Sequence, residues 1–184
     1  PIRIIVPWGA GGSTDQVTRV CAGDLEDALG QKIVVVNQPG GSGAVGTKST
    51  LDAPRDGYTW TAGAAKDLGT YAVTGKLDTK LQDWHLYLNQ ALVTVVSVHP
   101  DSPYKDFGDY LKALKAGKVT VATAGVNSSG HSAIESVVQA AGGSYKHLTY
   151  DGGNPAVIAT VGGEAQSTTQ LITEQVEMIR AKKL

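Results

Sequence analysis

Short hydrophobic runs alternate along the whole chain with glycine-rich loops and amphipathic segments. Ile2 to Val6 is apolar, and Ile33 to Val36 is a continuous β-branched run of the kind found in buried parallel strands. Residues 16–29 carry apolar side chains at helical spacing. Strand, loop and helix recur in this order, which predicts open, mainly parallel α/β sheets. Further strands are expected at 58–62, 91–98, 119–123, 145–150 and 165–168, and further helices at 44–51, 107–114, 131–141, 156–161 and 170–181.

The pattern restarts after residue 98, so the sequence predicts two α/β lobes rather than one. We place the change near Ser97, which gives lobes of residues 1–97 and 98–184 with residues 91–98 as the connecting strand. In open α/β sheets the loops that follow the strands lie along one edge, where ligands bind. The loops are therefore the candidate functional segments.

The first of these loops is residues 7–15, Pro-Trp-Gly-Ala-Gly-Gly-Ser-Thr-Asp. A glycine loop that enters a helix leaves backbone N–H groups unpaired, and these groups attract an anion together with the helix dipole. We expect Ser13 or Thr14 to cap the helix, and Asp15 to bind backbone N–H groups and stabilise the loop. A tight turn without a ligand is an equally good interpretation of this loop alone. Trp8 is either a packing residue or an apolar wall of a cleft.

The second half has its own loop in the same place, residues 124–130. If the halves face each other, two helix N-termini point into one cleft and suit a ligand with an anionic group at each end, such as a dicarboxylate. We expect His131 to help the helix begin rather than to act in catalysis, and Lys66, in a third loop, to be solvated.

Composition narrows the class of protein. The 184 residues are 41% hydrophobic and 18% charged, which is typical of a globular chain. A net charge of −1 without a basic cluster argues against nucleic acid as a partner. Cys21 is the single cysteine, so no internal disulfide is possible, and we expect it on the buried stripe of the first helix. No Cys/His cluster has zinc spacing, and we expect neither a metal nor a cofactor.

The chain lacks residues that the sequence motifs of common α/β enzymes require. A dinucleotide fingerprint would need glycine at Thr14 and an acidic residue at Asn37. Neither a P-loop nor a nucleophile elbow is present. A non-enzymatic binding protein is therefore favoured over an α/β enzyme acting on a small anionic substrate, and over a sensing domain of the same fold.

Several short motifs occur in order along the chain. They lie at residues 1–7, 11–15, 29–31, 36–40, 53–59, 98–100, 128–131 and 150–156. Together they resemble the substrate-binding proteins of tripartite tricarboxylate transporters, the TctC or Bug family. The resemblance implies a two-lobed periplasmic binding protein of type II, with a Venus-flytrap fold. Such a protein captures a small mono- or dicarboxylate and delivers it to membrane transporter subunits.

The resemblance also implies which residues hold the ligand, largely through backbone N–H groups, hydroxyls and waters. It places them at Gly11, Gly12, Ser13, Thr14, Asp15, Gly125, Ser128, Ser129 and His131. To these we add Trp8, Ala64 in the third loop, and Thr169.

The chain departs from the family in two respects. The segment 166–170 replaces a strand end that more often contains Asp, so we expect an uncharged contact at Thr168 or Thr169. Family members are also longer, and the chain is expected to be a truncated piece that lacks the closing C-terminal helices. Exposed sheet edges and apolar surface would then favour a dimer or a domain swap.

Overall fold

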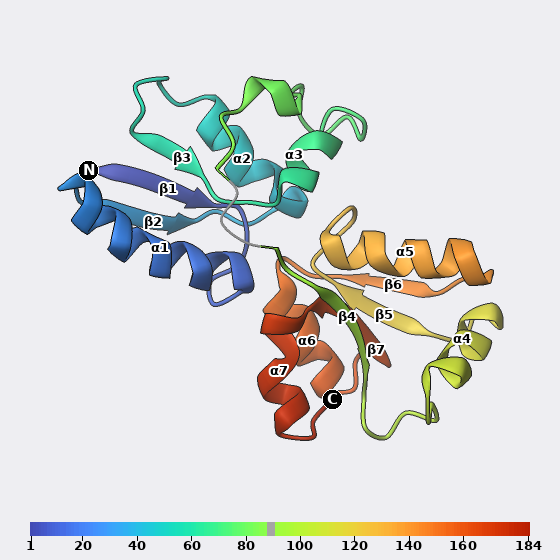
Figure 1. Ribbon diagram of the computed structural model, residues 1–184. Helices are drawn as coiled ribbons and strands as arrows, with labels where there is room; N and C mark the ends of the chain where they lie inside the picture. Colours follow the sequence, from blue (N-terminus) through green and yellow to red (C-terminus); the bar gives the residue numbers. More distant parts are fainter. Residues whose placement is uncertain (88–90) are drawn as a thin grey trace. The chain divides into compact units, whose positions relative to one another are not determined.

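The computed structural model describes residues 1–87 and 91–184 (Figure 1). The chain divides into two compact units, unit 1 at residues 1–90 and unit 2 at residues 91–184. The lobe boundary expected at residue 97 falls inside strand β4 (Thr94–Val98). Because β4 pairs with β7 (Ser167–Leu171), it belongs as a whole to the sheet of unit 2.

Within residues 1–87, three strands form a parallel sheet in the order β2-β1-β3. Parallel neighbours need crossover connections, and helices supply them here. The carboxyl ends of the strands therefore share one edge of the sheet. The strands are β1 (Ile2–Val6), β2 (Ile33–Asn37) and β3 (Thr59–Thr61). The helices are α1 (Ser13–Leu29), η1 (Gly41–Gly43), α2 (Ala44–Leu51), α3 (Ala65–Thr70) and η2 (Leu81–Asp83).

The two faces of this sheet are covered by different helices. On one face Ile2, Ile4 and Ile33 pack with Ala22 of α1. Helix α2 contacts β1 and β3 on the other side, and Figure 1 shows α1 and α2 flanking the strands. The approach of α2 depends on Gly46, where a Cβ atom would lie 2.7 Å from the Gln38 carbonyl oxygen.

Within residues 91–184, four strands form a mixed sheet in the order β4-β7-β5-β6. Strand β5 runs parallel to β6 and β7, and β4 is antiparallel to β7. The expectation of an α/β fold with mainly parallel sheets is confirmed. The strands other than β4 and β7 are β5 (Thr120–Thr123) and β6 (Lys146–Thr149). The helices are α4 (Phe107–Lys115), α5 (Ser129–Ala141), α6 (Gly153–Val161) and α7 (Ile172–Arg180).

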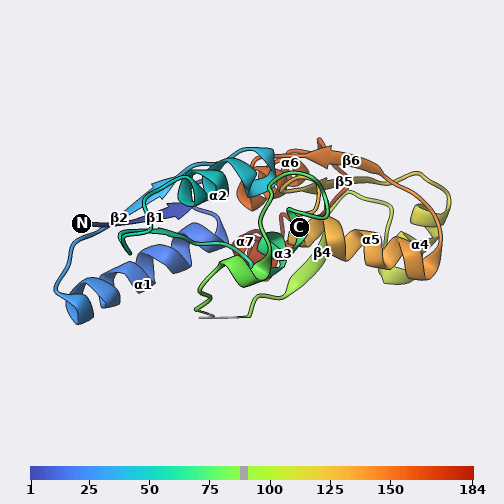
Figure 2. The ribbon, with the colours of Figure 1, turned by 90° about the horizontal axis from the view of Figure 1, so that it is seen from above.

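Successive side chains of β5 point to opposite faces of the sheet. The core of unit 2 therefore has two parts, each covered by different helices. Val121 packs with Tyr110 of α4 and Ile134 of α5, and these two helices contact each other (Figure 2). Ala122 points to the opposite face and packs with Ala156 of α6. Small side chains on that face let α6 lie close to the sheet.

Two helices of unit 2 begin earlier than the sequence predicts. Helix α5 begins at Ser129 rather than His131, and α6 begins at Gly153 rather than Ala156. Pro155 is compatible with the first turn of α6, because N–H groups there have no partner within the helix. The earlier starts bring serine and glycine residues into the first turns of both helices.

We predict that Gly46→Ala destabilises unit 1. The new methyl group would also lie 2.9 Å from the Pro7 Cα, so backbone must move, and the expected loss is about 1–3 kcal/mol of unfolding free energy. Urea denaturation followed by tryptophan fluorescence measures it, since all three tryptophans lie in unit 1. Gly69→Ala is the control, because apart from its chain neighbours and the backbone of α3 no described atom lies within 4 Å of its Cβ position. Equal losses in both variants would contradict this packing.

Candidate functional site

The loop after β1 ends at Gly12, which is the N-cap residue of α1 and has an extended backbone. Ser13 and Thr14 lie inside the helix, so the expectation that one of them is the N-cap is wrong. Gly11 has a φ of +78°, in the left-handed region that favours glycine. The approach to α1 is therefore made of backbone with very small side chains.

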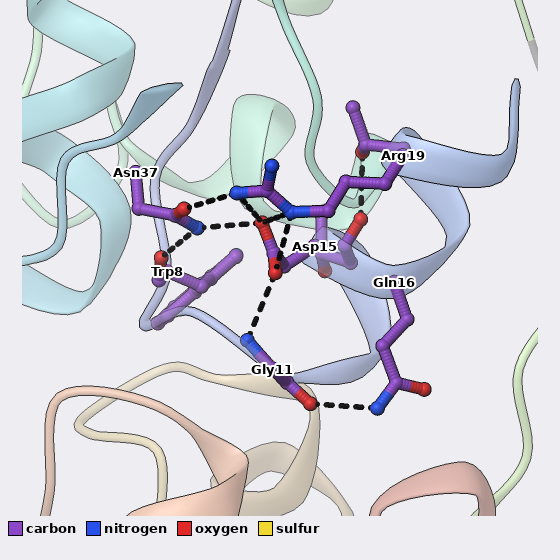
Figure 3. A network of polar contacts seen from close by, with 8 residues as sticks. Trp8, Gly11, Asp15, Gln16, Arg19 and Asn37 are labelled. Carbon is purple, nitrogen blue, oxygen red and sulfur yellow. Dashed lines mark hydrogen bonds and ion pairs between the residues drawn. The ribbon is translucent and has the colours of Figure 1, made fainter. Parts of the chain in front are cut away.

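The carboxylate of Asp15 holds this loop in place (Figure 3). Its Oδ2 accepts the Gly11 N–H at 2.9 Å, and its Oδ1 accepts from Asn37 Nδ2 at 2.9 Å. Arg19 Nε lies 3.0 and 3.1 Å from the two carboxylate oxygens. Asn37 also donates to the Trp8 carbonyl at 3.1 Å and accepts from Arg19 Nη2 at 2.9 Å. The ends of β1 and β2 are thus tied to the first turn of α1.

Asp15 is ionised in this setting. Burial of its carboxyl, which is 3% exposed, opposes ionisation. The hydrogen bonds from Arg19, Gly11 and Asn37 outweigh burial, and the pKa of Asp15 lies below its usual value. The predicted role of Asp15 in stabilising the loop is confirmed by this geometry. Since both oxygens are used within the protein, a contribution to ligand binding would be indirect.

The network also explains which face of α1 is buried. Val20 is 71% exposed and Cys21 is half-buried, so the prediction that Cys21 lies on a buried stripe of α1 is wrong. Asp15, Thr18 and Ala22 are buried instead. The contacts of Asp15 with the ends of two strands turn this polar side of the helix inward.

Sequence reasoning missed Arg19 and Asn37 as parts of the site. Two signals could have found them. Asp15 and Arg19 have the i, i+4 spacing of helical ion pairs. Asn37 is a polar residue at the end of an apolar strand, where side chains reach the loop edge.

The other strand-end residues of unit 1 are packed in various ways. The ring of Trp8 lies close to Gly43, whose Cβ position is 3.1 Å from it. Ala64 is the N-cap residue of α3. Lys66 is half-buried, and its Nζ lies 3.7 Å from Asp67 Oδ1. The prediction that Lys66 is solvated is therefore wrong. Burial raises the pKa of Asp67 to about 6.

The loop of unit 2 is held by side chains of its own helix. Ser128 is the N-cap of α5, and its Oγ accepts the His131 N–H at 3.2 Å. His131 Nδ1 accepts the Asn127 N–H at 3.1 Å. The prediction that His131 helps the helix begin is confirmed. Because Nδ1 is an acceptor here, the neutral ring carries its proton on Nε2.

A second histidine, which the sequence reasoning missed, supports the same loop. The rings of His131 and His147 stack with centroids 4.4 Å apart. His147 Nε2 lies 2.6 Å from Thr123 Oγ1, which accepts the Gly125 N–H. Burial lowers the pKa of His147, and the neighbouring His131 lowers it further. Both rings line a cavity of about 320 Å³ with Glu135 among its other walls.

Thr169 differs from its neighbour in the hydrogen bonds it makes. Thr168 Oγ1 donates to the Ala122 carbonyl at 3.0 Å. Thr169 Oγ1 is buried and has no hydrogen-bond partner in the described part of the chain. Gly130, in the first turn of α5, lies directly against the Thr169 carbonyl. Of the two threonines considered, only Thr169 has a hydroxyl without a hydrogen-bond partner among the described residues.

The predicted ligand residues thus gather in two sets. In unit 1 they lie at the carboxyl edge of its sheet, with Ala64 after β3 and the rest after β1. In unit 2 they lie where β5 and β7 meet α5, although Ser128 and His131 are partly occupied by each other.

Among the described residues, no group of three or more His, Cys, Asp or Glu side chains is placed to hold a metal ion. A search of the same residues finds no helix with the length and apolar character needed to span a membrane.

Comparison with known proteins places the chain in a family. Residues 17–184 match TctC, the tripartite tricarboxylate transporter family receptor. The chain belongs to this family. It is 31% identical over 190 residues to protein BugT of Bordetella pertussis, covering all of this chain and 58% of BugT. The chain spans little more than half the length of the curated relatives it matches. The family is one of transport receptors, not of enzymes.

Solved structures show the same fold. One, described as a periplasmic transporter, is 32% identical with a TM-score of 0.89, covering 99% of this chain and 63% of that one. MatC from Rhodopseudomonas palustris with bound malate has a TM-score of 0.86 at 21% identity, with coverage of 99% and 64%. Rpa4515 of R. palustris with adipate has a TM-score of 0.82 at 22% identity, with coverage of 99% and 62%. At these last identities the likeness shows the fold alone.

We predict that Asp15→Asn lowers the unfolding free energy at pH 7 by about 1–3 kcal/mol, because it removes a buried charge from its hydrogen-bond donors. The pKa of Asp15 is lowered by folding, so its contribution is present above pH ~4 and is lost as pH falls through the folded-state pKa. Urea denaturation at pH 7 and pH 3 measures the difference.

Arg19→Gln is the control for this variant. Loss of the Arg19 side chain is expected to cost less than Asp15→Asn does, because this side chain is 50% exposed and the carboxylate keeps its hydrogen bonds from Gly11 and Asn37. A larger loss in the arginine variant than in Asp15→Asn, or a gap that widens at pH 3, would contradict the assignment of the loop support to the carboxylate.

Proposed function

We propose that this chain is the ligand-capturing part of an extracytoplasmic solute-binding protein, specific for a small mono- or dicarboxylate and serving a tripartite tricarboxylate-type transporter. One observation carries the proposal: each unit has a small-residue loop that leads from a parallel strand into a helix N-terminus and is held by other side chains. Family membership and the malate and adipate bound to proteins of the same fold support it.

In unit 1 the ligand carboxylate binds at residues 11–14, through backbone N–H groups at the start of α1 and the hydroxyls of Ser13 and Thr14, while the Gly11 N–H stays bonded to Asp15. The support for this assignment is chemical. Asp15 already fixes the loop by accepting the Gly11 N–H, and the helix N-terminus favours a negative charge. Trp8 and Ala64 contribute apolar contacts from the same edge.

In unit 2 the ligand binds at Gly125, at Ser128 and Ser129 at the start of α5, and at Thr169. The buried Thr169 hydroxyl, which has no hydrogen-bond partner among the described residues, supports its assignment as an uncharged partner. We propose that one ligand is shared between the loops of the two units, that the protein acts in the periplasm, and that it hands its ligand to membrane subunits. Self-association of the chain stays a prediction.

A thermal-shift screen tests the proposed function. The panel contains C3 to C8 mono- and dicarboxylates, amino acids and aromatic acids. A ligand that binds only the folded state stabilises it by about 2.7 kcal/mol at 100 times its Kd. We expect one carboxylate class to raise the Tm. A panel in which no carboxylate raises it, or only cationic compounds do, would contradict the proposal.

Two variants show whether backbone groups do the binding. Ser13→Ala removes one hydroxyl and is expected to weaken the carboxylate hit by less than about tenfold. Gly12→Val places a branched side chain at the N-cap and is expected to abolish the shift. Equal effects of the two substitutions would rule out binding through the loop backbone.

A further inference from the structure

Three helices begin at one edge of unit 2. Strands β5, β6 and β7 are parallel, and each is followed directly by a helix, α5, α6 and α7 respectively. The first turns of α5 and α6 both contain small residues. By the argument used above for α5, this edge has the backbone chemistry for two anionic groups, one at each of these N-termini.

The N-terminus of α6, however, already has a carboxylate against it. The side chain of Glu174, in the first turn of α7, lies against Gly153, the first residue of α6. A Cβ atom at Gly153 would overlap both carboxylate oxygens of Glu174. Helix α6 has no acidic residue in its own first turn, and its N-cap is Gly152. Figure 1 shows α6 and α7 side by side. Glu174 therefore supplies the negative charge that the α6 dipole favours.

Glu174 is also connected to the loop of the proposed ligand site. The carboxamide of Gln170, oriented so that both its ends are satisfied, donates to Glu174 Oε2 at 3.2 Å. Its oxygen accepts the Ala124 N–H at 2.6 Å, at the start of the loop that leads to α5. The same amide group lies near Gly130 in the first turn of α5. The carboxylate is thus held in a defined position beside the loop.

We propose that Glu174 is a specificity-determining residue, a built-in carboxylate that occupies the α6 N-terminus and leaves unit 2 with a single anion-binding helix start, at α5. The inference rests on the proposed function. A ligand then presents one carboxylate to unit 2, and a further carboxylate near α6 meets the charge of Glu174. The chain accordingly selects mono- and dicarboxylates against tricarboxylates.

Isothermal titration with glutarate and with propane-1,2,3-tricarboxylate tests the selectivity, since the two ligands differ by one carboxylate. In Glu174→Gln the affinity for the tricarboxylate relative to glutarate is expected to rise about fivefold or more, the effect of one charge at a helix N-terminus. Glu177→Gln is the matched control, because it removes an exposed charge from the same helix and should leave the ratio unchanged. An unchanged ratio in Glu174→Gln, with glutarate still bound, would overturn the inference and leave the proposed function standing. Failure of every chain to bind either ligand would refute both.

A second measurement is independent of the transported ligand. Glu174→Ala removes the carboxylate and leaves space for a small anion. Sodium acetate is expected to raise the Tm of this variant by about 2–4 °C more than sodium chloride of equal concentration does. The unmodified chain and Glu177→Gln should show a smaller difference, because in them acetate can bind only at the proposed ligand loops and not at α6. The absence of an acetate effect in Glu174→Ala would contradict an anion position at α6.

Discussion

The loop edge of unit 1 depends on the buried carboxylate of Asp15. A loop of glycines has almost no side chains with which to fix its own shape, so something outside it must do so. Asp15 does this by accepting one N–H from the loop and one from the strand-end residue Asn37. A buried charge is costly unless it is paired and hydrogen-bonded, and Arg19 provides the opposite charge. Loop position and charge compensation are therefore both achieved around Asp15, with Asn37 and Arg19 as its side-chain partners.

In unit 2 the loop is fixed by neutral side chains instead of by a carboxylate. Ser128 and His131 exchange hydrogen bonds with the backbone of the loop and first turn, and Thr123 holds Gly125 from the strand. In both units polar side chains hold the loop in place by accepting hydrogen bonds from its backbone. This arrangement suits recognition of a carboxylate, because backbone N–H groups at a helix start are donors with a fixed direction and no charge of their own.

Much of the fold followed from apolar periodicity, and the exceptions have physical reasons. The five residues of β7 are almost all polar, Ser-Thr-Thr-Gln-Leu, yet the strand lies between two others and is buried. Two of its hydroxyls are satisfied by neighbouring carbonyls, Ser167 by that of Thr120 and Thr168 by that of Ala122. A prediction from hydrophobicity alone therefore ends this strand too early. Helix starts at Ser129 and Gly153 were placed late because serine and glycine favour loops as readily as first turns. The site residues Arg19, Asn37 and His147 act across elements, and local patterns do not show such pairings.

Hydrogen–deuterium exchange on the whole chain, with and without the carboxylate that gives the largest thermal shift, tests the central claim most directly. The claim is that backbone N–H groups of the two loops hold the ligand. The account predicts slower exchange on ligand addition in segments 11–15 and 125–131, with little change in α2 or α4. Slowing confined to other segments, or to neither loop while the ligand is bound, would contradict it.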